Sequence, residues 1–279
     1  MRLFILGILF FALARPAYAA PESAAAQPGN APTYADLADL AVTAPVAAHV
    51  RIKSAVVLKK EAATIPPGKA RFYVEAEVIS LIRAPQSMDA EVRYLADLPL
   101  DSSGRAPKLR KKSEYIVLAA EVPGRPGELR LVAPDAQLPW TAERAEQIRA
   151  ILKEAAAPDS PPRIIGIGRA FHVPGSLPGE SETQLFLLAA GGRPVSLSVL
   201  RRPGQEPSWA VALGEIVDES AAPPEPGTLL WYRLACGLPR ALPRQSLAES
   251  DSTSANAIRA DYAMVLSALG PCTRSRAKA

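Results

Sequence analysis

The 279-residue chain is poor in the residues that most catalytic and metal sites use, since it contains two histidines and two cysteines. The patterns GxSxG, HExxH and CxxC do not occur, which excludes the nucleophile elbow and the common zinc signatures. A P-loop is missing as well, and the glycines at 166 and 168 lack the third glycine of a dinucleotide fold. We therefore expect no cofactor and no metal, and a non-enzymatic role is favoured.

Long apolar runs are also scarce, and the one that is present lies at the N-terminus. Arg2 precedes an apolar stretch over residues 3–14, and residues 17–19 (AYA) form a small-x-small cleavage motif. This order is typical of a secretory signal peptide, and the run is shorter than the roughly 20 residues that a membrane span needs. We expect residues 1–19 to be removed, leaving a soluble periplasmic or secreted protein without a transmembrane anchor.

The net charge of +4 at pH 7 is concentrated near the two ends of the chain. Arg2 and Arg15 belong to the predicted signal peptide, and residues 274–279 form a basic tail, so the body between them is close to neutral. A generally basic surface for nucleic acid is therefore lacking, and export also argues against nucleic acid as a partner. The expected partners are an envelope protein or an anionic ligand.

Cys236 and Cys272 are predicted to form a disulfide, because thiols pair in the oxidising space outside the cytoplasm. The bond would close a loop of about 37 residues and stabilise the chain by roughly 4 kcal/mol in the chain-entropy model. It would connect the last helix to the apolar segment 228–236 (TLLWYRLAC), which we expect to be a central strand.

Alternation of apolar and polar residues predicts a mainly β fold in two β-rich halves, each followed by one α-helix. The first half covers residues 46–157 and the second covers residues 158–273, each as a small open barrel or a sandwich of about five strands. Proline and glycine mark hairpins at 123–127 and 190–192. A flexible leader is expected over residues 20–45, within which residues 34–42 have helical spacing and suit either a short helix or an extended arm.

The most suggestive cluster of chemical groups is His172, Glu180 and Glu182, which bracket a loop rich in proline and glycine. If the loop folds back, the imidazole and the two carboxylates would form a metal site or an acid–base pair. The plainer alternative is a histidine at a strand end beside two solvated carboxylates, and it is favoured because the spacing matches no known ligand pattern. These residues carry the alternative function of an envelope-polymer hydrolase.

A second candidate is a basic loop that we name by its residues 105–112. Five cations stand within this stretch: Arg105, Lys108, Arg110, Lys111 and Lys112. Outside the cytoplasm such a loop would bind phospholipid head groups, lipopolysaccharide phosphates or an acidic partner, while the alternative is a solvated connection between strands. The leading hypothesis is therefore a binding or assembly factor of the cell envelope that uses this loop.

Two weaker patterns complete the candidates. Arg201 and Arg202 near Trp209 could form a cation–π recognition patch, although the favoured reading is a half-buried tryptophan over which the arginines extend. A set of strand carboxylates would suit a glycosidase-type pair, but the wet face of an antiparallel sheet explains the same residues more simply. This set is Glu75, Glu77 and Glu91.

Overall fold

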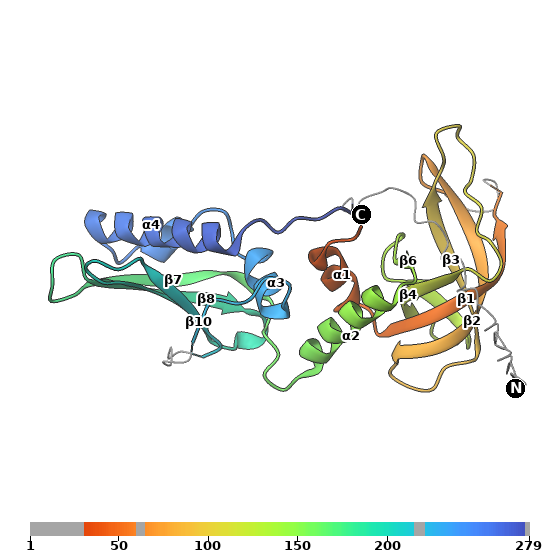
Figure 1. Ribbon diagram of the computed structural model, residues 1–279, viewed down its shortest axis with the longest axis horizontal. Helices are drawn as coiled ribbons and strands as arrows, with labels where there is room; N and C mark the ends of the chain where they lie inside the picture. Colours follow the sequence, from red (N-terminus) through yellow and green to blue (C-terminus); the bar gives the residue numbers. More distant parts are fainter. Residues whose placement is uncertain (1–30, 60–64, 215–220, 277–279) are drawn as a thin grey trace, which may run out of the picture.

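The computed structural model describes residues 31–59, 65–214 and 221–276 and shows a mainly β fold of two sheets with four α-helices (Figure 1). The predicted signal peptide lies outside these residues. The helices are α1 (Tyr34–Ala41), α2 (Ala142–Ala156), α3 (Leu229–Ala235) and α4 (Ser252–Leu269). The strands are β1 (Val46–Val57), β2 (Lys69–Arg83), β3 (Glu91–Pro99), β4 (Glu114–Glu121), β5 (Glu128–Leu131), β6 (Gln137–Pro139), β7 (Ile164–Pro174), β8 (Ser181–Ala189), β9 (Val195–Arg201) and β10 (Ser208–Ala212).

The first half is a closed five-stranded barrel. Its strand order is β1-β2-β3-β5-β4, and β4 returns to pair with β1, which removes both sheet edges. The β3–β5 pair is parallel and the other pairs are antiparallel, which is the arrangement of a Greek-key barrel of the OB type. Phe72, Val74 and Ala76 point into the barrel, so the alternation predicted for this strand is confirmed.

The second half is a four-stranded antiparallel sheet in the order β10-β9-β8-β7, with α4 lying along one face (Figure 1). The predicted stripe of α4 faces this sheet, where Ile258, Tyr262 and Val265 join the core. The opposite face carries apolar side chains that remain exposed: Ile165, Phe171, Val173, Leu188 and Leu200. This half is thus an open sheet with one covered face, and it has four strands because the expected fifth strand is a helix.

The prediction of a central strand over residues 228–236 is wrong, because this segment forms α3. The Thr228 side chain accepts a hydrogen bond from the Trp231 backbone N–H at 3.2 Å and so caps the helix. Leu234 packs into the core under the sheet, whereas Leu229 and Tyr232 pack into the core beside the barrel. A helix that is buried on two sides reads as a continuous apolar run, which periodicity alone does not separate from a strand.

Of the two alternatives for residues 34–42 within the predicted leader, the short helix is confirmed and the extended arm is wrong, since residues 34–41 form α1 and are largely buried rather than flexible. The Thr33 hydroxyl and the Asp36 carboxylate form a capping box at the start of this helix. Leu37 and Leu40 pack with α2 and with the barrel strands in one core, so the helix has apolar contacts on several sides. The helix is too short to be stable in water alone and depends on this packing.

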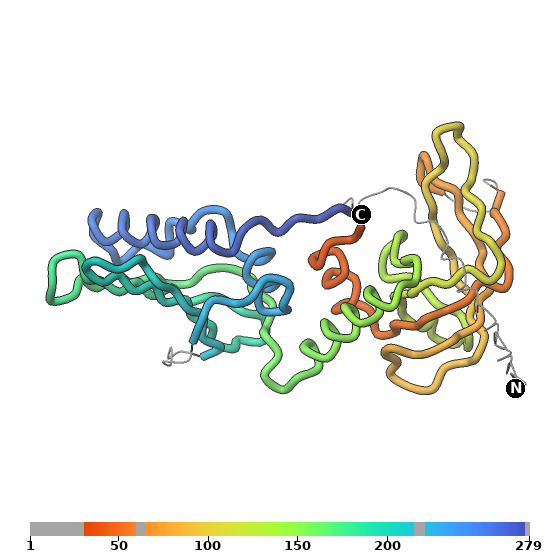
Figure 2. Tube along the Cα trace, in the orientation of Figure 1, coloured from red at the N-terminus to blue at the C-terminus, as the bar shows by residue number. Residues whose placement is uncertain are grey.

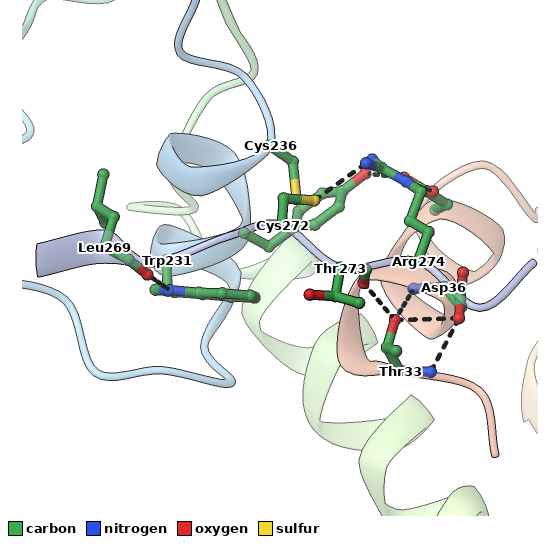
Figure 3. Close-up of a disulfide and its surroundings, with 10 residues drawn as sticks. Thr33, Asp36, Trp231, Cys236, Leu269, Cys272, Thr273 and Arg274 are labelled. Atoms are coloured by element: carbon green, nitrogen blue, oxygen red, sulfur yellow. Dashed lines mark hydrogen bonds and ion pairs between the residues drawn. A yellow bond between two sulfur atoms is a disulfide. The ribbon is translucent and has the colours of Figure 1, made fainter. Parts of the chain in front are cut away.

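The C-terminal segment, residues 272–276, returns from the sheet to α1, and we call it the clasp (Figure 2). The Cys236–Cys272 disulfide, which the sequence predicted, joins the clasp to the end of α3 (Figure 3). Arg274 donates two hydrogen bonds to the Asp39 carboxylate at 2.6 and 3.1 Å. In the part of the predicted basic tail that the structure describes, residues 274–276, Arg274 is thus bound to α1.

The clasp also satisfies two further carboxylates. Arg276 binds Asp135 through two hydrogen bonds of 2.6 and 2.7 Å. Asp36 is fully buried and accepts hydrogen bonds from the Ser275 hydroxyl at 2.7 Å and the Ser275 N–H at 2.9 Å. Burial would raise the pKa of Asp36, but these bonds and those from the Thr33 and Arg276 N–H groups outweigh it and lower the pKa to about 2.

Acid should therefore weaken the fold through Asp36. Because its pKa lies below the usual 3.8, the ionised form stabilises the native state above pH 4, and this contribution disappears as the pH falls toward 2. We expect a loss on the order of 2 kcal/mol, measured by urea unfolding between pH 6 and pH 2.5. Asp36→Asn should be less stable at pH 6 and should show a shallower pH dependence. Equal slopes for the two proteins would contradict this assignment.

Removal of the disulfide tests the clasp from the other side. The double variant Cys236→Ser with Cys272→Ser should lower the free energy of unfolding by about 2–4 kcal/mol, because the unfolded chain regains the entropy of an open loop. Guanidinium unfolding with and without reductant measures this effect. Reductant should destabilise the wild type and leave the double variant unchanged, and an unchanged wild-type midpoint would argue against the stabilising role.

Candidate functional site

The basic loop lies in the connection between β3 and β4, which projects from the barrel (Figure 1). Leu109 packs against the barrel core, and the Lys112 N–H donates to the Ile52 carbonyl at 2.8 Å. The Asp101 carboxylate accepts hydrogen bonds at 2.9 Å from the N–H groups of Ser103 and Arg105, which folds the start of the connection into a turn. The loop is thus anchored at both ends and in its middle.

The cations of the basic loop point away from this anchored backbone. Lys108, Arg110, Lys111 and Lys112 are exposed, and none of them lies within 4.0 Å of a carboxylate oxygen in the described part of the chain. Arg105 lies 3.5 Å from Asp101 across an exposed i,i+4 pair, which contributes little energy. The loop therefore presents four cations that repel one another, and an anion bound there would relieve this repulsion.

His172 belongs to a hydrogen-bonded chain on the face of the sheet that α4 covers. Its Nδ1 lies 2.8 Å from the Thr183 hydroxyl, which in turn donates to the buried Asp261 carboxylate of α4. Because the hydroxyl proton is directed to Asp261, the hydroxyl oxygen accepts a hydrogen bond from Nδ1 of the imidazole. Arg201 balances the Asp261 charge, with its Nε 2.7 Å from Oδ1.

The predicted cluster of His172 with Glu180 and Glu182 does not form. The Glu180 carboxylate accepts hydrogen bonds from the backbone N–H groups of Ser176 and Leu177, so it closes its own loop. His172 is paired across the ladder with Thr183, whereas Glu182 is paired with Val173. Since neighbouring residues on a strand point to opposite faces, Glu182 lies on the face away from His172.

This arrangement removes the geometric basis for a metal or acid–base site at the β7–β8 loop. In the described ranges, no group of three histidine, cysteine or carboxylate side chains is placed to hold a metal ion. The reading of a histidine at a strand end fits the contacts, with the addition of the Thr183–Asp261 relay that the spacing in sequence did not reveal.

The other two candidates are also explained by local partners. Arg201 binds Asp261 and does not lie over Trp209, which is partly buried against the sheet core. The strand carboxylates form an ion-pair ladder on the wet side of the barrel and do not act as a free pair. In this ladder Glu75 accepts from Ser54 at 2.8 Å, Glu77 lies 3.5 Å from Arg51, and Glu91 pairs with Lys53.

His49, the second histidine, is almost fully buried on the outside of β1. Its Nε2 lies 2.8 Å from Glu114 Oε2, and its ring stacks on Trp140 with the ring centroids 4.7 Å apart. The other carboxylate oxygen of Glu114 accepts from Arg51. Burial would raise the pKa of Glu114, but hydrogen bonds from Arg51 and His49 lower it. We read this cluster as a support for the barrel wall.

A hollow of about 630 Å³ lies on the outer face of β2, β3 and β5, and the sequence reasoning missed it. Tyr73 and Leu95 are direct cross-strand neighbours in its floor, and residues 131–134 line one side. Four arginines and two carboxylates also line it: Arg71, Arg93, Arg125, Arg130, Asp97 and Glu128. The sequence signal that could have located the hollow is the alternation on two neighbouring strands. It places Arg71 and Tyr73 on the outward face of one strand and Arg93 and Leu95 on the outward face of the next.

None of the helices in the described ranges has the length and hydropathy that a membrane-spanning segment needs.

Substitutions of Asp261 and His172 test how much each side chain contributes to the stability of the fold. Asp261→Ala should lower the free energy of unfolding by about 3 kcal/mol or more, because it leaves Arg201 and Thr183 without their buried partner. His172→Ala should cost about 1 kcal/mol, since it removes one hydrogen bond at a half-buried position. Urea unfolding of the two variants measures both values, and a larger loss for His172→Ala than for Asp261→Ala would reverse the assignment.

Comparison of the chain with protein-family models gives no match, and comparison with curated protein sequences gives none either.

Proposed function

We propose that the chain is a non-enzymatic binding or assembly factor of the cell envelope and that its basic loop docks onto an anionic partner. The observation that carries this proposal is the set of four exposed cations held by an anchored loop without a carboxylate partner in the described residues. Like charges kept together without neutralisation cost free energy, so the arrangement suits a surface that is completed by an external anion.

The disulfide and the N-terminal motif support a place outside the cytoplasm for this activity. A disulfide between Cys236 and Cys272 is consistent with an oxidising compartment. The apolar run of residues 3–14 with its cleavage motif favours export to the periplasm or to the medium. Anions offered there include phosphorylated lipids and acidic envelope proteins, either of which a polybasic loop would attract.

The hydrolase alternative has less support. It needs a histidine and a carboxylate that converge on one point, whereas His172 and Glu182 point to opposite faces of the sheet. The imidazole of His172 is instead oriented by Thr183. We therefore place the function in the basic loop and assign the His172 chain to the stability of the second half.

Charge reversal of the loop tests the proposal. The triple variant Lys108→Glu, Arg110→Glu and Lys111→Glu should lose its partner in mild in-cell crosslinking followed by co-purification and mass spectrometry. The fold should survive, because the anchoring contacts of Leu109 and Asp101 are unchanged. Binding measured with the purified partner should also weaken by about tenfold or more at high ionic strength, since exposed charges are screened.

A matched control removes the effect of net charge. Arg202→Glu, Arg240→Glu and Arg244→Glu change the same number of exposed cations at positions in the second half of the chain. This control should keep the partner. Binding that survives reversal of the basic loop, or that is lost equally in the control, would remove the loop from the function.

A further inference from the structure

We infer that the hollow on β2, β3 and β5 is a second binding site, which takes a small organic anion of sugar size bearing phosphate or carboxylate groups. The site is distinct from the basic loop and does not depend on the function proposed for it. Its volume of about 630 Å³ lies within the roughly 300–1,000 Å³ that small-molecule sites occupy.

The charges in the hollow leave two arginines for a ligand. Asp97 is occupied by Arg71, which donates two hydrogen bonds of 2.6 and 2.7 Å. Glu128 lies 3.3 Å from Arg125. Arg93 and Arg130 have no carboxylate oxygen within 4.0 Å in the part of the chain that the structure describes. The lining therefore carries an excess of two positive charges, which matches a dianion.

The two arginines stand where they can bind the same anion. In the parallel β3–β5 pair, Arg93 lies beside Glu128, and Arg130 follows two residues later on the same outward side. Strand spacing and rise place their backbones about 8 Å apart. Since an arginine side chain spans about 6 Å or more, both guanidinium groups can converge, and their planar forks fit phosphate and carboxylate oxygens.

The nearest acidic neighbours limit where the anion can sit. An added Cβ at Gly127 would lie 3.0 Å from an Asp89 carboxylate oxygen and 3.7 Å from an Arg93 Nη2, so Asp89 lies at the hairpin end of the hollow. Glu75 is the cross-strand neighbour of Arg93 and is hydrogen-bonded to Ser54. The anionic group is therefore expected toward Arg130, away from these two carboxylates.

The floor of the hollow specifies the rest of the ligand. Tyr73 and Leu95 lie side by side on the outer face of the barrel, and Leu95 is 45% exposed. An aromatic ring beside an exposed aliphatic side chain suits the C–H face of a sugar ring or a similar flat apolar surface. We therefore expect a ring on the floor and its anionic substituent close to Arg130, within reach of the Arg93 side chain.

Titration followed by amide chemical shifts tests the site on the full chain. The probes are glucose 6-phosphate, glucuronic acid and neutral glucose. We expect saturable shifts centred on Tyr73, Leu95 and Arg130 with one or both anions and none with glucose, and the stronger probe distinguishes a phosphate ligand from a carboxylate ligand. The proposal would be overturned if neither anion gave saturable shifts up to about 10 mM. A dissociation constant of that size corresponds to a binding free energy of about −3 kcal/mol.

Variants make the assignment specific. Arg93→Gln and Arg130→Gln should each weaken binding by tenfold or more and should melt like the wild type, because both side chains are exposed. The triple reversal of the basic loop should leave this binding unchanged, so failure of one site is distinguishable from failure of the other. Wild-type affinity in both arginine variants, or equal binding of glucose, would also reject the site.

Discussion

The buried carboxylate of Asp36 is the point on which the arrangement of the two halves depends. A charge with no exposure to water is tolerated only when hydrogen bonds replace its hydration. Thr33 supplies some of these bonds locally, and Ser275 and Arg276 of the clasp supply the others. Within the same clasp, Arg274 binds Asp39 and Arg276 binds Asp135, and the disulfide fixes the clasp to α3. Helix α1 is therefore held by the clasp as well as by its apolar contacts with α2, α3 and the barrel strands, which form the core beside the barrel.

Charged side chains on the outside of the barrel are arranged in two different ways. Along β1 and β2 each carboxylate meets a cation or a hydroxyl, as Glu77 does with Arg51, so this wall is nearly neutral. The basic loop and the hollow instead keep cations without carboxylate partners among the described residues. The barrel holds these like charges close together despite their repulsion. Leu109 fixes the basic loop to the barrel core, and the β3–β5 pairing fixes the strands that carry Arg93 and Arg130.

Local patterns in the sequence were sufficient for most elements and insufficient for the places where distant segments meet. Alternation located the barrel strands, glycines located the 190–192 turn, and Thr141 located the start of α2. The α3 segment was misread because two separate cores bury it, and no local period reports that. The same limit applies to the hollow, whose arginines come from three strands and the β4–β5 turn, and to Thr183 and Asp261, which meet only when α4 covers the sheet.

The position of the clasp has a consequence for the order in which the molecule becomes native. A ribosome releases α1 long before the clasp, so until residues 275 and 276 have emerged Asp36 has none of the donors that they later supply. The barrel strands can pair in the meantime, because all of their pairing partners lie within residues 46–139. The contact between the clasp and α1, however, cannot form until residues 272–276 have been synthesised. The hydrogen bonds between the clasp and α1 therefore form late, and a chain truncated before residue 272 would lack both these bonds and the disulfide.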